Sequence, residues 1–266
     1  MMRAFTGILQ RELLSTFAAP LAWVALGAFS LVTALLFWLE LLAFEVQQQR
    51  ATALGDPALL ALLDFNDLLL GSTLLHAQVL LIFIVPVMTM RLLAEEQRSG
   101  TLDFLLASPV QPSVIVAAKL ASLALFLAAA CALLLVYPVL LALFGRAVVA
   151  GDGVVDWGQV LLGVAGVFAT GLLYASLGLA VSSATSSPAA AALVTALLLV
   201  GLWFLGGASG GVPGAGGEVL SWLAPASHLE RGVRGVLALS DLVYFASGTA
   251  AFSFGAVALL ESRRRA

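Results

Sequence analysis

Six long apolar runs constrain the fold of this chain more than any other feature of its sequence. A helix needs about 20 mainly apolar residues to cross the hydrocarbon core of a bilayer. The runs that reach this length are approximately residues 20–44, 68–90, 118–144, 159–181, 189–207 and 242–260. Each run is continuously apolar rather than alternating, which favours helices over the strands of a membrane barrel. The sequence therefore predicts an all-α polytopic membrane protein, with residues 1–266 forming a single transmembrane domain of six spans.

The distribution of basic residues predicts the orientation of these spans. Six spans place both termini on the same side of the membrane. Eight basic residues then lie on the side of the termini and four on the other. Those on the side of the termini are Arg3, Arg11, Arg91, Arg98, Lys119, Arg263, Arg264 and Arg265. Because cytoplasmic segments carry an excess of Lys and Arg, we expect the N- and C-termini to be cytoplasmic.

Two segments outside the spans are also expected to be helical. Residues 2–18 place apolar side chains on one face of a helix and polar ones on the other, a pattern typical of an interfacial helix. We expect this amphipathic helix to lie along the cytoplasmic surface and to end at Pro20, where the first span begins. Before the sixth span, apolar pieces too short to cross the membrane predict two short outer helices, separated at Pro225.

A polar segment, residues 91–117, connects the second and third spans. It holds 5 of the 27 formal charges of the chain between Arg91 and Asp103, a density that lipid does not tolerate. We expect a helix that continues out of the membrane, a break at Ser99-Gly100, and a second short helix capped by Thr101. This second helix suits either a groove on another protein or the membrane surface, and its composition leaves both open.

The residues of this segment form a recognisable pattern, E-E-x-x-x-G-T-L-D-x-L-L-x-S-P. Its fixed positions are Glu95, Glu96, Gly100, Thr101, Leu102, Asp103, Leu105, Leu106, Ser108 and Pro109, with the basic Lys119 beyond them. The pattern resembles the cytoplasmic loop of ABC-2-type permeases, the membrane subunits of type-2 ATP-binding-cassette exporters. The resemblance extends over the whole chain, from the interfacial helix to the terminal RRR. Within this family, the chain resembles the permeases of the gliding-motility type.

The resemblance implies that the second short helix is a coupling helix, which inserts into a cleft on a separate ATPase subunit. Two such ATPases would drive two permeases, this chain and a second copy or a paralogue, in the inner membrane of a bacterium. The implied docking residues are Glu95, Glu96, Arg98, Gly100, Thr101, Leu102, Asp103, Phe104, Leu105, Leu106, Ser108 and Pro109. The apolar contacts are assigned to Leu102, Phe104, Leu105 and Leu106. The polar contacts that would fix the position of the helix in the cleft are assigned to Glu95, Glu96, Arg98 and Asp103.

The chain itself lacks the usual sequence for using ATP. It contains no G-x-x-x-x-G-K-[ST] phosphate loop, and Lys119 is its only lysine. We therefore expect no enzyme activity and no cofactor in this chain, with ATP and Mg bound by the partner ATPase. Further expected partners are the lipid bilayer and an accessory periplasmic or membrane protein, but not nucleic acid.

Other functions depend on the few remaining ionisable or polar groups. His76 and Gln78 in the second span either line a translocation path or form helix–helix hydrogen bonds. The scarcity of charges in the spans disfavours an ATP-independent secondary transporter or channel. An integral membrane protease would need an E-E-x-x-x-R pair, but Arg98 follows Glu96 too closely, and both histidines are predicted near the opposite face. The isolated His76 and His228 do not form a metal-ligand set.

Overall fold

The computed structural model describes residues 2–55, 64–107, 110–144 and 155–265. Within these ranges all regular secondary structure is helical. The described residues contain six stretches long and apolar enough to cross a membrane, namely Pro20–Leu54, Asn66–Ser99, Pro112–Phe144, Trp157–Ala184, Pro188–Ser209 and Leu239–Arg265. The predicted all-α fold with six candidate spans is therefore confirmed.

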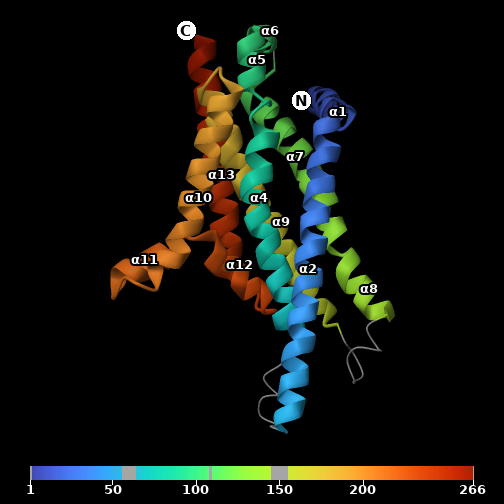
Figure 1. Cartoon of the computed structure of the whole chain (residues 1–266). Helices are drawn as coiled ribbons and strands as arrows, with labels where there is room; N and C mark the ends of the chain where they lie inside the picture. The colour runs from blue at the N-terminus through green and yellow to red at the C-terminus, as the bar shows by residue number, and fades with distance from the viewer. Residues whose placement is uncertain (1, 56–63, 108–109, 145–154, 266) are drawn as a thin grey trace.

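The elements follow one another in the predicted order (Figure 1). The amphipathic N-terminal helix is α1 (Met2–Ala18). The candidate spans contain α2 (Pro20–Leu54), the π-helical η1 (Asn66–Gly71) with α4 (Ser72–Thr89), α7 (Pro112–Leu134) with α8 (Val136–Phe144), α9 (Trp157–Ala184), α10 (Pro188–Ser209) and α13 (Leu239–Arg265). The short helices are α5 (Ala94–Ser99), at the end of the second apolar stretch, and α6 (Thr101–Ala107), α11 (Ala215–Leu223) and α12 (Pro225–Val233), between stretches.

Prolines and a capping carboxylate set several helix ends. Pro20 and Pro225 begin α2 and α12, in the first turn, where the missing N–H of proline removes no helical hydrogen bond. Asp156 caps α9, because its Oδ1 accepts hydrogen bonds from the backbone N–H groups of Gly158 (2.8 Å) and Gln159 (3.2 Å). The two predicted junctions at Pro20 and Pro225 are confirmed.

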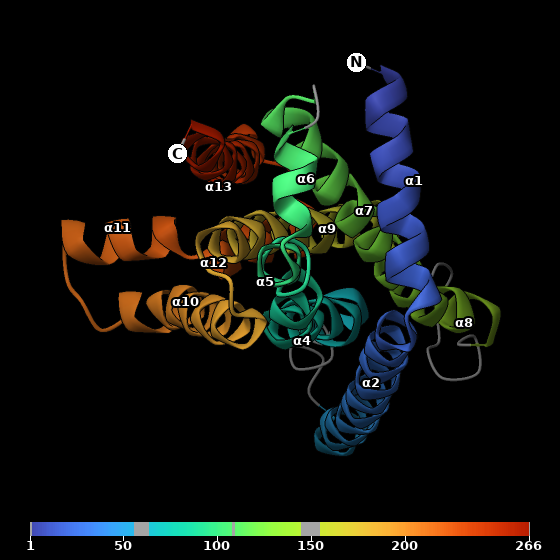
Figure 2. The ribbon, with the colours of Figure 1, turned by 90° about the horizontal axis from the view of Figure 1, so that it is seen from above.

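Helix α9 is at the centre of the bundle and packs against α4, α7, α12 and α13 (Figure 2). Glycines let two neighbours approach closely. A Cβ on Gly171 would meet a side-chain carbon of Leu127 at 2.8 Å, and one on Gly178 would collide with Thr89. By contrast, α2, α10 and α13 expose large apolar side chains on the bundle surface, as expected of helices that face lipid or another subunit.

Both termini lie at the same end of the bundle. Figure 1 shows them there together with α5 and α6, while α11 and α12 are nearer the other end. In the end-on view α1 runs across the end of the bundle instead of along the spans (Figure 2). This arrangement follows from an even number of spans. It brings α1, the polar segment and the beginning of α7 together.

Candidate functional site

The polar segment between the second and third spans is anchored on the end of α9. The prediction of a helix continuing unbroken to Ser99 is wrong, because α4 ends at Thr89 and a turn separates it from α5. In this turn the backbone N–H groups of Leu93 and Ala94 donate to Ser182 Oγ at 3.2 and 3.0 Å. A hydroxyl on another helix thus replaces the carbonyl acceptors that a continuous helix would supply.

The predicted break at Gly100 is confirmed. Gly100 ends α5 with a φ of 72°, a left-handed conformation that glycine adopts without strain. Thr101 is the first residue of α6 rather than the N-cap before it, and its hydroxyl oxygen lies 2.9 Å from that of Ser99. Gln97 secures α5, because its Nε2 donates to the carbonyl oxygen of Ser183 in α9 at 2.9 Å. These contacts hold α5 and α6 against the bundle end.

The apolar side chains of α6 divide into an inward and an outward set. Leu102 and Leu106 are buried in the protein core, and Leu105 packs partly against it. These leucines were predicted to contact the ATPase, but Leu102 and Leu106 instead attach α6 to its own bundle. Phe104 points outward and is 81% exposed. Among the described side chains of α6, Phe104 is therefore the large apolar one that is exposed.

The charged docking candidates on α5 face in different directions. Glu95 and Arg98 are exposed. Glu95 pairs with Arg91 one turn earlier, with 2.6 Å between Arg91 Nε and Glu95 Oε2. Three further candidates lie outside what the structure describes: the side chain of Asp103, Ser108 and Pro109. Contact of any of these residues with an ATPase stays a prediction.

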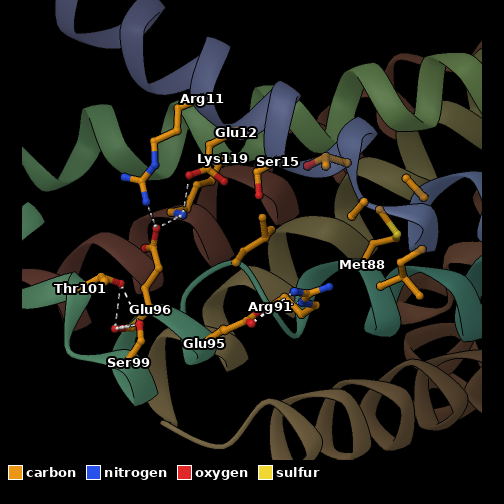
Figure 3. A pocket seen from close by; sticks show the side chains of 15 residues that line it. Arg11, Glu12, Ser15, Met88, Arg91, Glu95, Glu96, Ser99, Thr101 and Lys119 are labelled. Atoms are coloured by element: carbon orange, nitrogen blue, oxygen red, sulfur yellow. Dashed lines mark hydrogen bonds and ion pairs between the residues drawn. The ribbon is translucent and has the colours of Figure 1, made fainter.

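Glu96 turns inward and joins a buried ion cluster, which we call the Lys119 cluster. Lys119 of α7 is 1% exposed, and its Nζ lies 3.0 Å from both Glu96 Oε1 and Glu12 Oε1. Because Glu12 belongs to α1, the cluster joins α1, α5 and α7 (Figure 3). Arg11 adds a looser contact, with its Nη2 3.8 Å from Glu96 Oε1. A buried ammonium is tolerated only with such partners, and removal of Lys119 would leave two buried carboxylates without their shared ammonium.

The Lys119 cluster was not predicted from the sequence. Glu96 was predicted to contact the ATPase, Lys119 was assigned no ion pair, and Glu12 was not a candidate. One signal was present, since a lone lysine in an apolar span requires an oxygen partner. The sequence does not reveal which partner, because 107 residues separate Glu12 from Lys119.

A cleft of about 250 Å³ lies beside the Lys119 cluster. Its polar lining comes mainly from α1, α5 and Lys119, and its apolar lining from the beginning of α2, the end of α4 and the turn after it. Figure 3 shows Arg11 and Glu96 toward one side of the cleft and Met88 toward the other. The cleft is therefore amphipathic, with charged groups at the α1 end of the bundle.

The two path candidates of the second span point in different directions. Gln78 is buried, and its Nε2 donates to the hydroxyl of Tyr174 in α9 at 3.2 Å. The side chain of His76 is 48% exposed, and its Nδ1 lies 2.6 Å from Glu40 Oε1 in α2. Glu40 also accepts a hydrogen bond from Thr73 at 2.9 Å. Gln78 thus joins two helices, while His76 lies at the surface of the bundle.

A second buried cluster, the His228 cluster, joins α11 and α12 to α13. His228 Nδ1 lies 2.7 Å from Asp241 Oδ1, and its Nε2 lies 2.8 Å from the carbonyl oxygen of Trp222. The Tyr244 ring stacks on the imidazole, with 3.9 Å between ring centroids. Arg231 Nε donates to Asp241 Oδ2 at 3.1 Å, and its hydrogen bonding to Asp241 raises the pKa of Arg231. Across the described parts of the chain, no group of three or more His, Cys, Asp or Glu side chains is placed to hold a metal ion.

Comparison with known protein families gives one match that covers nearly the whole chain. The model of the family described as ABC-2 family transporter protein matches residues 7–260. The chain belongs to the ABC-2 transporter family. A comparison with curated proteins gave no match.

As an ABC-2 transporter, the chain is a multi-pass membrane protein of the permease type, a class that is typically non-catalytic. The side-chain geometry also disfavours a protease. Glu95 and Glu96 pair with different partners, Arg91 and Lys119 respectively. Catalytic carboxylates must reach the same substrate, and these two are each held in a separate ion pair.

Proposed function

We propose that this chain is the permease subunit of a bacterial ABC exporter, located in the inner membrane with both termini in the cytoplasm. Two copies, or one copy and a paralogue, would form the path. Two separate ATPase subunits would supply energy from ATP and Mg. Membership of the ABC-2 family and a sequence without the phosphate-loop motif support this division of labour. The resemblance to gliding-motility-type permeases supports a place in that subgroup and an accessory membrane or periplasmic partner.

Helix α6 is the element that we assign to ATPase docking. The observation that carries this assignment is the exposure of Phe104 on a helix whose leucines Leu102 and Leu106 are buried. An exposed aromatic ring on a firmly packed helix suits an interface anchor, because it buries a large area on binding and loses little side-chain entropy. Glu95 and Arg98, exposed on the adjacent α5, would add charged contacts around it.

The Lys119 cluster would connect this docking helix to the spans. Glu96 lies on α5, which a single residue, Gly100, separates from α6. A shift of α6 would therefore move Glu96, and Lys119 and Glu12 would follow, because separating paired charges in a buried site is unfavourable. The movement that accompanies closure of the two ATPases would in this way be transmitted to α7 and α1.

His76 is the path-lining candidate that we retain in the second span. A half-exposed imidazole is unfavourable against hydrocarbon, which supports a position at the path or against the second permease. Gln78 contributes to packing with α9 instead. The mainly apolar surface of the spans supports an amphipathic, lipid-like or membrane-attached substrate. Transport of a small hydrophilic solute by the reconstituted complex would contradict this substrate class.

Affinity purification in mild detergent tests the docking assignment. The native complex should contain a P-loop ATPase in stoichiometric amount, identified by mass spectrometry and by its activity. Phe104→Asp should abolish its recovery. The control Leu237→Asp, at an exposed apolar residue between α12 and α13, should not. Full recovery with Phe104→Asp would remove α6 from the interface, and a homogeneous permease that never carries an ATPase would favour an ATP-independent channel or carrier.

A further inference from the structure

We propose that the cleft beside the Lys119 cluster binds the phosphoethanolamine headgroup of a membrane phospholipid, with the acyl chains directed toward the spans. The cleft volume of about 250 Å³ is many times the roughly 10–15 Å³ that one water molecule needs. This space accommodates a headgroup, while the acyl chains of the lipid would have to lie along the outside of the bundle.

The lining of the cleft has most of its polar groups on one side and its apolar groups, together with the Arg91–Glu95 ion pair, on the other. Arg11 and Glu96 lie toward one side, and Met88 toward the other (Figure 3). Leu21 and Leu92 add to the apolar lining, where α2 begins and just beyond the end of α4. The amphipathic α1, which carries part of the polar lining, crosses the end of the bundle. A matching ligand is polar at the α1 end and apolar toward the spans, as a phospholipid at a membrane interface is.

Glu96, one of the residues that line the cleft, has a buried carboxylate oxygen that lacks a donor. Glu96 faces Lys119 with Oε1, but its Oε2 is buried and has no hydrogen-bond partner among the described residues. A buried acceptor without a donor is destabilising, so we expect a donor from outside the chain. A primary ammonium provides both an N–H and the opposite charge. The quaternary ammonium of a choline headgroup has no N–H and cannot satisfy this oxygen.

Basic side chains in the same cleft suit the phosphate. The side chain of Arg11 is 63% exposed, and its 3.8 Å separation from Glu96 Oε1 is beyond hydrogen-bonding distance. Its guanidinium is therefore placed to bind phosphate oxygens in pairs. The charged side chains that line the cleft balance one another, being Arg11, Arg91 and Lys119 against Glu12, Glu95 and Glu96. A zwitterionic headgroup fits this balance better than a net anionic one.

Lipid retention by the purified permease tests the proposal. Delipidated protein is incubated separately with phosphatidylethanolamine, phosphatidylcholine and phosphatidylglycerol of identical acyl chains, and bound lipid is counted by native mass spectrometry. We expect phosphatidylethanolamine to be retained at least about tenfold better than the other two, because of these three it alone offers an ammonium N–H. Equal retention of the three lipids would overturn the proposal.

Neighbouring substitutions on α1 locate the bound lipid. Ser15 lines the cleft, so Ser15→Trp should obstruct it and abolish the preference for phosphatidylethanolamine. Leu14 is exposed and does not line the cleft, so Leu14→Trp should retain the preference. Glu96→Gln preserves the cleft volume but replaces the unpaired acceptor with an amide, and should also remove the preference. A preference that survives both Ser15→Trp and Glu96→Gln would place the lipid elsewhere and overturn the proposal.

Soluble glycerophosphoethanolamine distinguishes a lipid from a free headgroup compound. Because it lacks acyl chains, we expect it to compete at least about tenfold less well than phosphatidylethanolamine. Equal competition would overturn the lipid assignment and identify a site for a soluble molecule. None of these measurements requires an ATPase, so the lipid proposal and the docking proposal fail independently.

Discussion

The two ends of the bundle hold buried ion clusters that differ in how far apart in the sequence their paired residues are. At the end with the termini, Lys119 pairs with Glu12, a residue 107 positions away in the sequence. Toward the other end, Asp241 pairs with His228, only 13 positions away. The Lys119 cluster joins three helices that are far apart in the chain, whereas the His228 cluster joins three consecutive ones.

On the coupling that we propose, this difference would separate a contact that transmits movement from one that fixes a local shape. In the Lys119 cluster, α5 cannot shift alone without separating charges that α1 and α7 hold in a buried site. In the His228 cluster, the same kind of chemistry fastens α11 and α12 to the beginning of α13. Buried ion pairs contribute little net stability, so their main effect is to specify which elements stay together.

Removal of the shared cation should have the largest effect on stability. Lys119→Met leaves Glu12 and Glu96 buried with only the looser contact of Arg11 to Glu96, and we expect the free energy of unfolding to fall by about 3–5 kcal/mol. Thermal melting in detergent measures this as a lower Tm. The control Glu12→Gln/Glu96→Gln/Lys119→Met removes all three charges and should melt close to the wild type. An unchanged Tm for Lys119→Met alone would contradict the buried pairing.

Disruption of the His228 cluster should have a smaller and local effect. Asp241→Ala removes the acceptor of both His228 and Arg231, and we expect a loss of about 1–3 kcal/mol. Hydrogen exchange should become faster in α11 and α12 and stay unchanged in α1. As a control, Glu230→Ala removes an exposed ion pair with Arg234 and should change stability by at most about 1 kcal/mol. Faster exchange in α1 of Asp241→Ala would show that this cluster is not local.

Loss of a single buried hydrogen bond gives a reference for the size of these two stability losses. Gln78→Leu removes the donor to Tyr174 while keeping a side chain of similar size, and should lower stability by about 1 kcal/mol. The double variant Gln78→Leu/Tyr174→Phe leaves neither partner unpaired and should recover part of this loss. Equal Tm values for Gln78→Leu and the wild type would mean that the bond contributes nothing to the packing of α4 on α9.

Truncation of the exposed ring on α6 should have the smallest effect on the permease itself. Phe104→Ala should change the free energy of unfolding by no more than about 0.5 kcal/mol, because the ring is exposed. Its affinity for the ATPase should nevertheless fall by at least about 2 kcal/mol, or roughly thirtyfold in Kd, as expected of an interface anchor. Binding of purified ATPase to permease in nanodiscs measures this, and an unchanged Kd would exclude Phe104 as the anchor.

The spans were predictable from apolar length, but several of their ends were not, and the end of the first span differs most. The sequence places the end of the first span near residue 44, where polar residues begin. Helix α2 instead continues to Leu54, because polar residues do not end a helix, and Gly55 with its φ of 64° does. The junctions at Pro20 and Pro225 were predictable because proline acts locally on the backbone.

The candidate site was predictable only where local backbone chemistry decides the structure. Gly100 marks a real break, since glycine favours the left-handed conformation found there. The turn before α5 was not predictable, because the acceptor for Leu93 and Ala94 is Ser182, far along the chain. The inward direction of the Glu96 side chain was not predictable either, because its partner Lys119 lies on another helix. Local sequence gives the shape of a segment, but not the remote partners that orient its side chains.

Hydrogen exchange in the complex of permease and ATPase tests most directly whether movement of α6 reaches the spans through Lys119. Exchange is compared with and without ATP and vanadate, in the wild type and in Glu12→Gln/Glu96→Gln/Lys119→Met. We expect ATP and vanadate, which trap the ATPases in one state, to change hydrogen exchange in α6, α1 and α7 of the wild type. In the neutralised variant we expect a change in α6 alone. Responses of α1 and α7 in the variant equal to those of the wild type would contradict transmission through the cluster.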